Sequence, residues 1–134
     1  MVFLHGDLGA GKSTLARALL RALGVEGAIR SPTYTLVERY PLPAGGGALH
    51  LDLYRIGDAG ELEFLGLTDA EATLWLVEWP ERGSSALPPA DLHVRLALQG
   101  RGRQALLEPG TGVGQDWIRA LQRDGRLQPL FAVN

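Results

Sequence analysis

Residues 6–13 of this chain read Gly-Asp-Leu-Gly-Ala-Gly-Lys-Ser, the full spacing of a phosphate-binding loop. In such a loop the glycines let backbone N–H groups converge on phosphate oxygens. The lysine ammonium reaches the β- and γ-phosphates, and the serine hydroxyl can bind Mg²⁺. Because the loop must connect a buried strand to a helix, it restricts the fold as well as the ligand.

The residues on either side of the loop supply that context. Residues 1–5 are typical of the end of a buried strand, and residues 13–23 repeat leucines at helical spacing before Gly24, a residue typical of a helix end. Phosphate would then lie at the helix N-terminus, where free N–H groups favour an anion. The predicted nucleotide-binding residues are Gly6, Asp7, Leu8, Gly9, Ala10, Gly11, Lys12, Ser13 and Thr14.

The rest of the chain predicts alternating strands and short helices. Residues 34–40 and 48–54 are expected to form one antiparallel hairpin, and residues 91–98 and 104–108 a second. Further predictions are one or two short helices between residues 58 and 72, a buried strand at 74–79 and a closing helix at 114–122. The expected fold class is α/β: a P-loop NTPase-like core sheet with flanking helices and added antiparallel hairpins.

Composition limits the classes of function that suit the chain. Its 134 residues, 46% of them hydrophobic, are enough for one domain spanning residues 1–134. A net charge of −2 argues against a broad nucleic-acid surface, so any contact with RNA is expected to be indirect, through a partner. There is no cysteine, no apolar run of membrane-spanning length and no visible signal peptide. We therefore expect a cytoplasmic protein without membrane partners.

Two acidic residues are candidates for the chemistry beside a bound nucleotide. Glu78 ends the apolar strand, where a carboxylate would emerge beside the phosphate loop, and Asp52 lies on the polar face of the 48–54 strand with His50 and Tyr54. We assign Glu78, with Ser13, to magnesium, and Asp52 to water positioning or to indirect magnesium binding. The reverse assignment stays open, as does a purely structural role for either acid.

Several other polar segments have two interpretations each. Thr33, or Thr35, would lie near Mg²⁺ and the γ-phosphate if residues 31–35 act as a switch segment, but the same residues suit an ordinary turn. Arg55 and Arg82 either stabilise phosphate charge or are surface residues. The Gly-Arg-Gly-Arg segment at 100–103 either touches RNA phosphates or is a solvated hairpin turn. Trp79 either stacks near the nucleotide or meets a partner, whereas Trp75 is expected in the core.

Taken together, four segments resemble the ordered motifs of the TsaE (YjeE) family. They are residues 6–14, 31–38 (Ser-Pro-Thr-Tyr-Thr-Leu-Val-Glu), 50–55 (His-Leu-Asp-Leu-Tyr-Arg) and 77–83 (Val-Glu-Trp-Pro-Glu-Arg-Gly). The stretch 61–67 between them is similar too. Four motifs in this order are far more specific than one phosphate-binding loop.

The resemblance implies an ATPase of bacterial tRNA modification that acts with the TsaB and TsaD proteins in making threonylcarbamoyladenosine. In that family ATP hydrolysis, with Mg²⁺, supports turnover of the TsaB–TsaD transferase, and tRNA is reached only through the complex. Carried onto this chain, Lys12 and Ser13 hold phosphate and magnesium, Glu78 is the acid beside the metal, and Asp52 is the essential carboxylate of its motif. Thr33 belongs to the switch-like segment.

The chain departs from the family pattern at its start, because family members usually carry a further helix and strand before the strand that enters the loop. We expect that segment to be missing from this domain. Two rival functions also suit the loop. One is a small-molecule kinase, although no lid or substrate-binding insertion is visible, and the other is a module that senses ATP without hydrolysing it. The expectation is an ATPase that is weak alone.

Overall fold

The computed structural model describes residues 1–57, 60–62, 72–83 and 86–130. Its strands are β1 (Val2–His5), β2 (Val37–Pro41), β3 (Gly47–Asp52), β4 (Ala72–Glu78), β5 (Leu92–Gln99) and β6 (Gly102–Pro109). Its helices are α1 (Lys12–Ala22), α2 (Gly112–Arg123) and the 3-10 helices η2 (Pro80–Arg82) and η3 (Gly125–Leu130).

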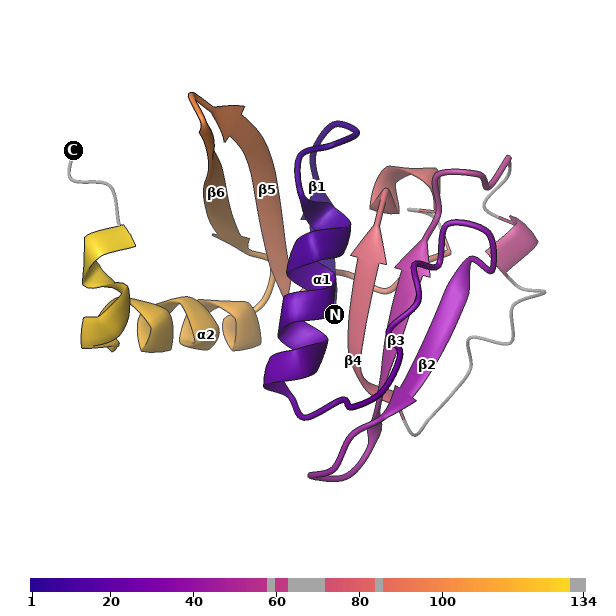
Figure 1. The fold of residues 1–134 in the computed structure, drawn as a ribbon, viewed down its shortest axis with the longest axis horizontal. Helices are drawn as coiled ribbons and strands as arrows, with labels where there is room; N and C mark the ends of the chain where they lie inside the picture. Colours follow the sequence, from indigo (N-terminus) through magenta and orange to yellow (C-terminus); the bar gives the residue numbers. More distant parts are fainter. Residues whose placement is uncertain (58–59, 63–71, 84–85, 131–134) are drawn as a thin grey trace.

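The six strands form one mixed sheet in the order β2-β3-β4-β1-β5-β6 (Figure 1). The four central strands run parallel, and β2 and β6 each pair antiparallel with their neighbour in sequence. The expected α/β class and both expected hairpins are therefore confirmed. Because β1 lies between β4 and β5, the loop that follows it emerges in the middle of the sheet, at the carboxyl ends of the parallel strands.

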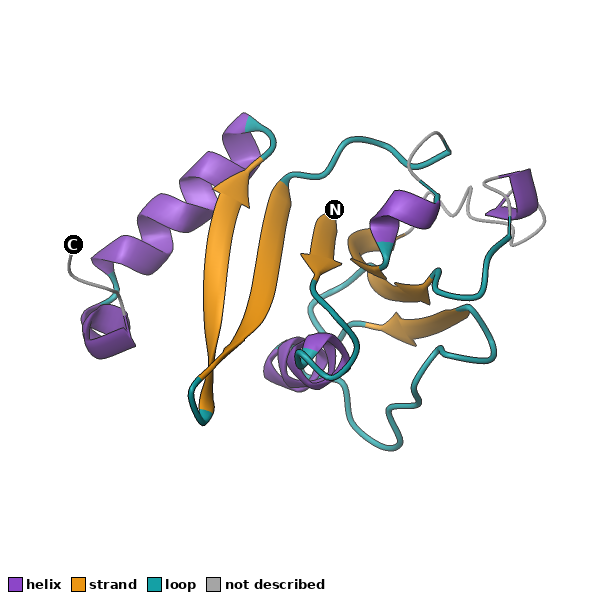
Figure 2. Ribbon diagram, turned by 90° about the horizontal axis from the view of Figure 1, so that it is seen from above, coloured by secondary structure: helices purple, strands orange, loops and turns teal. Residues whose placement is uncertain are grey.

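Both faces of the central sheet are buried, as expected for parallel strands. On β1, Val2 and Leu4 pack on the side of α1, whereas Phe3 packs on the opposite side. The α1 side also receives Ala16 and Leu20 from the helix itself. Figure 2 shows α1 lying against one side of the sheet and η2 lying on the other. The sheet thus has a core on each side, which holds β1 and the start of α1 firmly in place.

Helix α1 begins within one residue of the prediction and ends in the expected way. Gly24 adopts a φ of 98°, its N–H donates to the carbonyl of Arg21, and the N–H of Val25 donates to the carbonyl of Leu20. This is a Schellman ending, in which a left-handed residue lets the last carbonyls find donors. The glycine after the leucine repeat was the sequence signal for it.

Several strand boundaries differ from the sequence prediction, and the start of β2 differs most. The predicted strand at 34–40 starts only at Val37, because Leu36 has a φ of 67° and the preceding residues form a turn closed by its N–H on the carbonyl of Pro32. Strand β3 ends at Asp52 rather than at Tyr54. The helices predicted between residues 58 and 72 lie largely outside the described residues.

The C-terminal helix α2 is longer than the predicted 114–122. Thr111 caps it, because the hydroxyl of that residue accepts the N–H of Gly114. The helix enters close to the loop before β5: a Cβ on Gly114 would lie 1.7 Å from the carbonyl oxygen of Asp91. Among the described residues, no helix is both long and apolar enough to cross a membrane.

Candidate functional site

The loop between β1 and α1 has a conformation that its glycines make accessible. Gly6 has a φ of 149°, and a Cβ there would lie 2.7 Å from the carbonyl oxygen of Leu96 on β5. Gly11, which precedes the first helical residue, has a φ of 109°. Residues that carry a side chain rarely adopt such φ angles, so both positions require glycine. The N–H of Ala10 donates to the carbonyl of Asp7 and closes the loop on itself.

Lys12 points into the site and is only 5% exposed. Its ammonium donates to the carbonyls of Gly6 and Asp7, and it lies 3.9 Å from the centre of the Trp79 ring. Burial lowers the pKa of Lys12, while nearby carboxylates, Glu78 first among them, oppose that shift. A desolvated cation held by neutral groups is a strong attractor for an anion.

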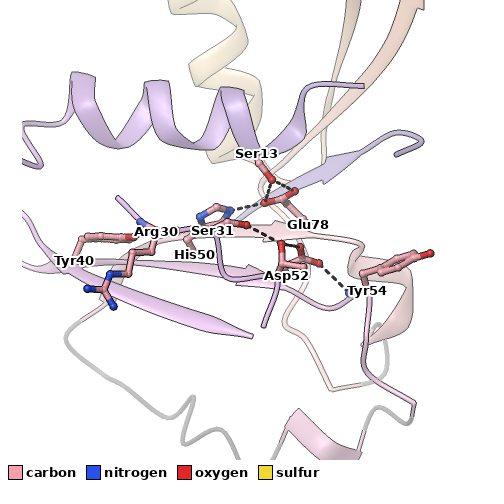
Figure 3. Close-up of polar contacts among 9 residues, drawn as sticks. Ser13, Arg30, Ser31, Tyr40, His50, Asp52, Tyr54 and Glu78 are labelled. Atoms are coloured by element: carbon pink, nitrogen blue, oxygen red, sulfur yellow. Dashed lines mark hydrogen bonds and ion pairs between the residues drawn. The ribbon is translucent and has the colours of Figure 1, made fainter. Parts of the chain in front are cut away.

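Glu78 is the hub of a buried hydrogen-bond chain at the end of β4 (Figure 3). The hydroxyl of Ser13 donates to its two carboxylate oxygens at 2.9 and 3.1 Å, and Nε2 of His50 lies 2.6 Å from Oε2. Glu78 is 2% exposed and His50 fully buried. The β4 strand runs beside β1 with Glu78 opposite Leu4, which brings the carboxylate to the first turn of α1.

Asp52 stands next to Glu78 on the neighbouring strand, since the two are register partners of β3 and β4. Its Oδ1 accepts the N–H of Tyr54 at 3.0 Å, and its Oδ2 accepts the hydroxyl of Thr33 at 3.4 Å. The Thr33 hydroxyl also lies 2.7 Å from that of Ser31. Residues 31–33 and the two acids therefore meet at the carboxyl ends of β3 and β4.

These groups surround one pocket of about 390 Å³. Its lining is Asp7, Leu8, Gly9, Gly11, Lys12, Ser13, Thr14, Thr33, Asp52, Tyr54, Arg55, Glu78, Trp79 and Arg103. All the residues predicted for nucleotide, metal and catalysis line it, apart from Gly6 and Ala10 of the loop. The sequence thus identified residues that lie together in space, and their roles stay a prediction.

For several residues that had two interpretations, the structure shows whether the side chain lies at the pocket or away from it. Thr35 donates to Glu38 and does not line the pocket, in contrast to Thr33. Trp79, in the left-handed region with a φ of 56°, places its ring against Lys12 and Tyr54. Trp75 packs on the core opposite α1, as expected.

Arg55 and Arg82 also differ in whether they line the pocket. Arg55 lines the pocket and lies over the Tyr34 ring, with 4.3 Å from its guanidinium carbon to the ring centre. Arg82 lies over the Tyr54 ring at 5.3 Å and is not part of the lining.

Arg103 is the one pocket residue that the sequence did not connect with the loop. Its Nε donates to the carbonyl of Ala10 at 3.0 Å and its Nη2 to that of Gly9 at 3.4 Å. Neither interpretation of the 100–103 segment included such a contact. An arginine in a hairpin turn carries no local signal that its partner lies more than 90 residues earlier in the chain.

The oxygen donors around the pocket fit a hard cation. Ser13 supplies a hydroxyl, and Glu78 and Asp52 supply carboxylates, the ligand types that Mg²⁺ prefers. In the described part of the chain, no three His, Cys, Asp or Glu side chains gather as a metal site by themselves. In proteins Mg²⁺ is usually bound by one or two carboxylates, together with waters and oxygens of substrate phosphates.

A glycine-rich loop between a central parallel strand and a helix, with a buried carboxylate on the adjacent strand in contact with the loop serine, defines a P-loop protein of the α/β class. A solved structure agrees with this fold. The crystal structure of Bacillus subtilis YdiB superposes on 91% of this chain and 76% of its own with a TM-score of 0.71, at 23% sequence identity.

Within that class, the family model for threonylcarbamoyl adenosine biosynthesis protein TsaE matches residues 1–105. The tRNA threonylcarbamoyladenosine biosynthesis protein TsaE of Haemophilus influenzae is 46% identical over 122 residues, which are 90% of this chain and 77% of the relative. The protein of the same name from Streptomyces coelicolor is 36% identical over 125 residues, 90% of this chain and 84% of the relative. The chain belongs to the TsaE family, as the resemblance predicted, and so to the proteins of tRNA threonylcarbamoyladenosine biosynthesis.

Proposed function

We propose that this chain binds MgATP in the pocket beside Lys12, hydrolyses it slowly when alone, and supports turnover of the TsaB–TsaD transferase in the cytoplasm. The observation that carries the proposal is the contact between Ser13 and Glu78 within a phosphate-binding loop. A hydroxyl and a carboxylate beside the loop are groups that a magnesium nucleotide requires, and their contact supports the proposal. Family membership supports the tRNA-modification context.

The residues predicted for phosphate, metal and catalysis each have a part in the proposed reaction. Lys12 neutralises charge on the β- and γ-phosphates, and the loop N–H groups bind their oxygens. Ser13 and Glu78 would hold Mg²⁺, which would offset the charge that develops on the phosphate oxygens. Asp52, fixed by Thr33 and by the N–H of Tyr54, accepts a hydrogen bond from the attacking water.

The chemical step is an in-line displacement. Water attacks the γ-phosphorus, the bond from that atom to the β–γ bridging oxygen breaks, and ADP and inorganic phosphate result. Positioning and charge stabilisation supply most of the rate in such reactions. The rim of the pocket at Arg55 is open to solvent, because Tyr34, whose ring lies against Arg55, is 79% exposed. We therefore propose that turnover is weak in the isolated chain and rises when TsaB and TsaD cover this rim.

The test compares Lys12→Ala with Arg17→Ala, which removes an exposed cation from the same helix. Phosphate release and tRNA modification are measured with and without TsaB and TsaD. We expect Lys12→Ala to lose ATP binding and to fail in the three-protein assay, and Arg17→Ala to behave as the wild type. Wild-type modification by Lys12→Ala would reject the proposal. Labelled phosphate on a small acceptor, rather than free in solution, would instead indicate a kinase.

A further inference from the structure

The hairpin of β5 and β6 hydrogen-bonds to the phosphate loop through the side chain of Arg103. Both the hairpin turn and the loop lie at the same end of the sheet (Figure 1). From the second residue of β6, the guanidinium spans two successive carbonyls of the loop, those of Gly9 and Ala10, through Nη2 and Nε. Its third nitrogen, Nη1, donates to the carbonyl of Gly102 at 3.2 Å, which anchors the side chain to its own strand.

These contacts act on the part of the loop that presents N–H groups. The carbonyl of Ala10 belongs to the same peptide unit as the N–H of Gly11, the residue that caps α1 with a φ of 109°. A guanidinium on that carbonyl fixes the plane of the peptide. It also draws electron density toward the oxygen, which makes the attached N–H a stronger donor.

The contact also brings charge to the pocket. Within the described part of the chain, the cationic side chains that line the pocket are Lys12, Arg55 and Arg103. Arg55 lies over the Tyr34 ring, and Lys12 already donates to loop carbonyls. Lys12 follows β1 directly and Arg55 follows β3. Arg103 alone comes from β6, which lies on the opposite side of β1 from β3 in the strand order, so the β5–β6 hairpin supports the loop from that side.

We propose that Arg103 is a positioning residue of the nucleotide site, which holds residues 9–11 in the shape that binds phosphate and strengthens the N–H of Gly11 as a donor. The inference rests on the proposed function, because it specifies how the same site is prepared for MgATP. The bidentate guanidinium is essential to it. A lysine carries the same charge but cannot span two carbonyls in a fixed plane.

The experiment uses Arg103→Gln and Arg103→Lys, with Arg101→Gln as the matched control. Arg101 is an exposed cation in the turn of the same hairpin and does not line the pocket. Calorimetric titration with MgATP measures affinity, and thermal unfolding without ligand reports the fold. We expect Arg103→Gln to weaken MgATP binding on the order of tenfold, the loss typical of hydrogen bonds to a charged group. Arg103→Lys should fall between it and the wild type, and Arg101→Gln should match the wild type.

A second measurement needs no nucleotide. In ¹H–¹⁵N spectra of the free protein, the amide proton of Gly11 should shift upfield in Arg103→Gln and stay in place in Arg101→Gln, because only the first variant loses the donor on its peptide carbonyl. An unmoved Gly11 signal, or equal MgATP affinity in Arg103→Gln and Arg101→Gln, would overturn the inference. Failure of the wild type itself to bind MgATP would instead reject the proposed function, and the Gly11 shift would still decide the role of Arg103.

Discussion

Replacing His50 with leucine tests the buried chain that fixes Glu78. The imidazole is fully buried, and its Nε2 lies 2.6 Å from Oε2 of Glu78. A carboxylate can only accept, so we assign the proton between the two atoms to Nε2. Nδ1 has no hydrogen-bond partner among the described residues. Leucine is similar in size, so His50→Leu removes one donor from Glu78 together with the unpartnered Nδ1, and the second loss is favourable.

The size of the effect follows from what Glu78 retains. Breaking a buried ion pair costs about 3–5 kcal/mol when the remaining charge is stranded. Here Glu78 keeps the Ser13 hydroxyl at 2.9 Å and borders the pocket, where water can reach it. We therefore expect a loss below the value of one charged hydrogen bond, about 1 kcal/mol, because removal of the unpartnered Nδ1 offsets part of it. For a chain of this length, that loss lowers the melting temperature by about 4 °C.

The assay is a double-mutant cycle read by urea and thermal unfolding. His50→Leu, Glu78→Gln and the double variant are compared with the wild type, and His50→Gln serves as a control that restores a donor. The loss caused by His50→Leu should shrink to about half in the Glu78→Gln background, because a neutral amide suffers less from losing its donor. Equal losses in both backgrounds would refute the reasoning, as would a His50→Leu variant as stable as the wild type.

Two further predictions concern the site and the fold. Glu78→Ala should impair magnesium-dependent ATP binding more than Asp52→Ala does, whereas Asp52→Ala should act mainly on turnover. Titrations with ATP, with and without a chelator of Mg²⁺, measure the binding. The opposite ranking would exchange the roles of the two acids. Gly114→Ala should destabilise the chain by about 3 kcal/mol, because its Cβ would collide with the carbonyl of Asp91. Gly112 lies in the same helix, but a Cβ there would have no atom within 4 Å. In thermal unfolding, Gly112→Ala should therefore be neutral or stabilising by about 0.5 kcal/mol. A similar loss of stability in both variants would contradict the steric explanation.

A contact in the site could be predicted from the sequence when its two residues are close in the chain, or when they lie on strands whose order the sequence indicates. The meeting of Ser13 with Glu78 follows once a loop-entering strand and an acid-ending apolar strand are taken as parallel neighbours. The alternation of β3 likewise placed His50 and Asp52 on one face. It did not reveal that His50 is buried, because burial depends on α1 covering that face.

Other contacts have no signal in the local sequence. Arg103 reaches the loop only because β5 follows β1 in the sheet, an order that periodicity does not encode. The turn before β2 was mistaken for strand because Thr35 and Leu36 suit extended structure, whereas tertiary contacts hold Leu36 in a left-handed conformation: its carbonyl accepts the N–H of Asp52 on β3. The Thr111 cap did carry a signal, a threonine just before a helix, that the predicted boundary overlooked.

The contacts of Lys12 have a consequence for how any phosphate ligand is held. Its ammonium is already engaged by the carbonyls of Gly6 and Asp7 and by the face of Trp79. An incoming phosphate therefore competes with the protein for its own lysine, and only the difference between the two sets of contacts contributes to affinity. Such an exchange favours ready release, because the protein's own acceptors recapture the lysine as a product departs. For the proposed role beside TsaB and TsaD, a ligand that is released readily would permit repeated turnover.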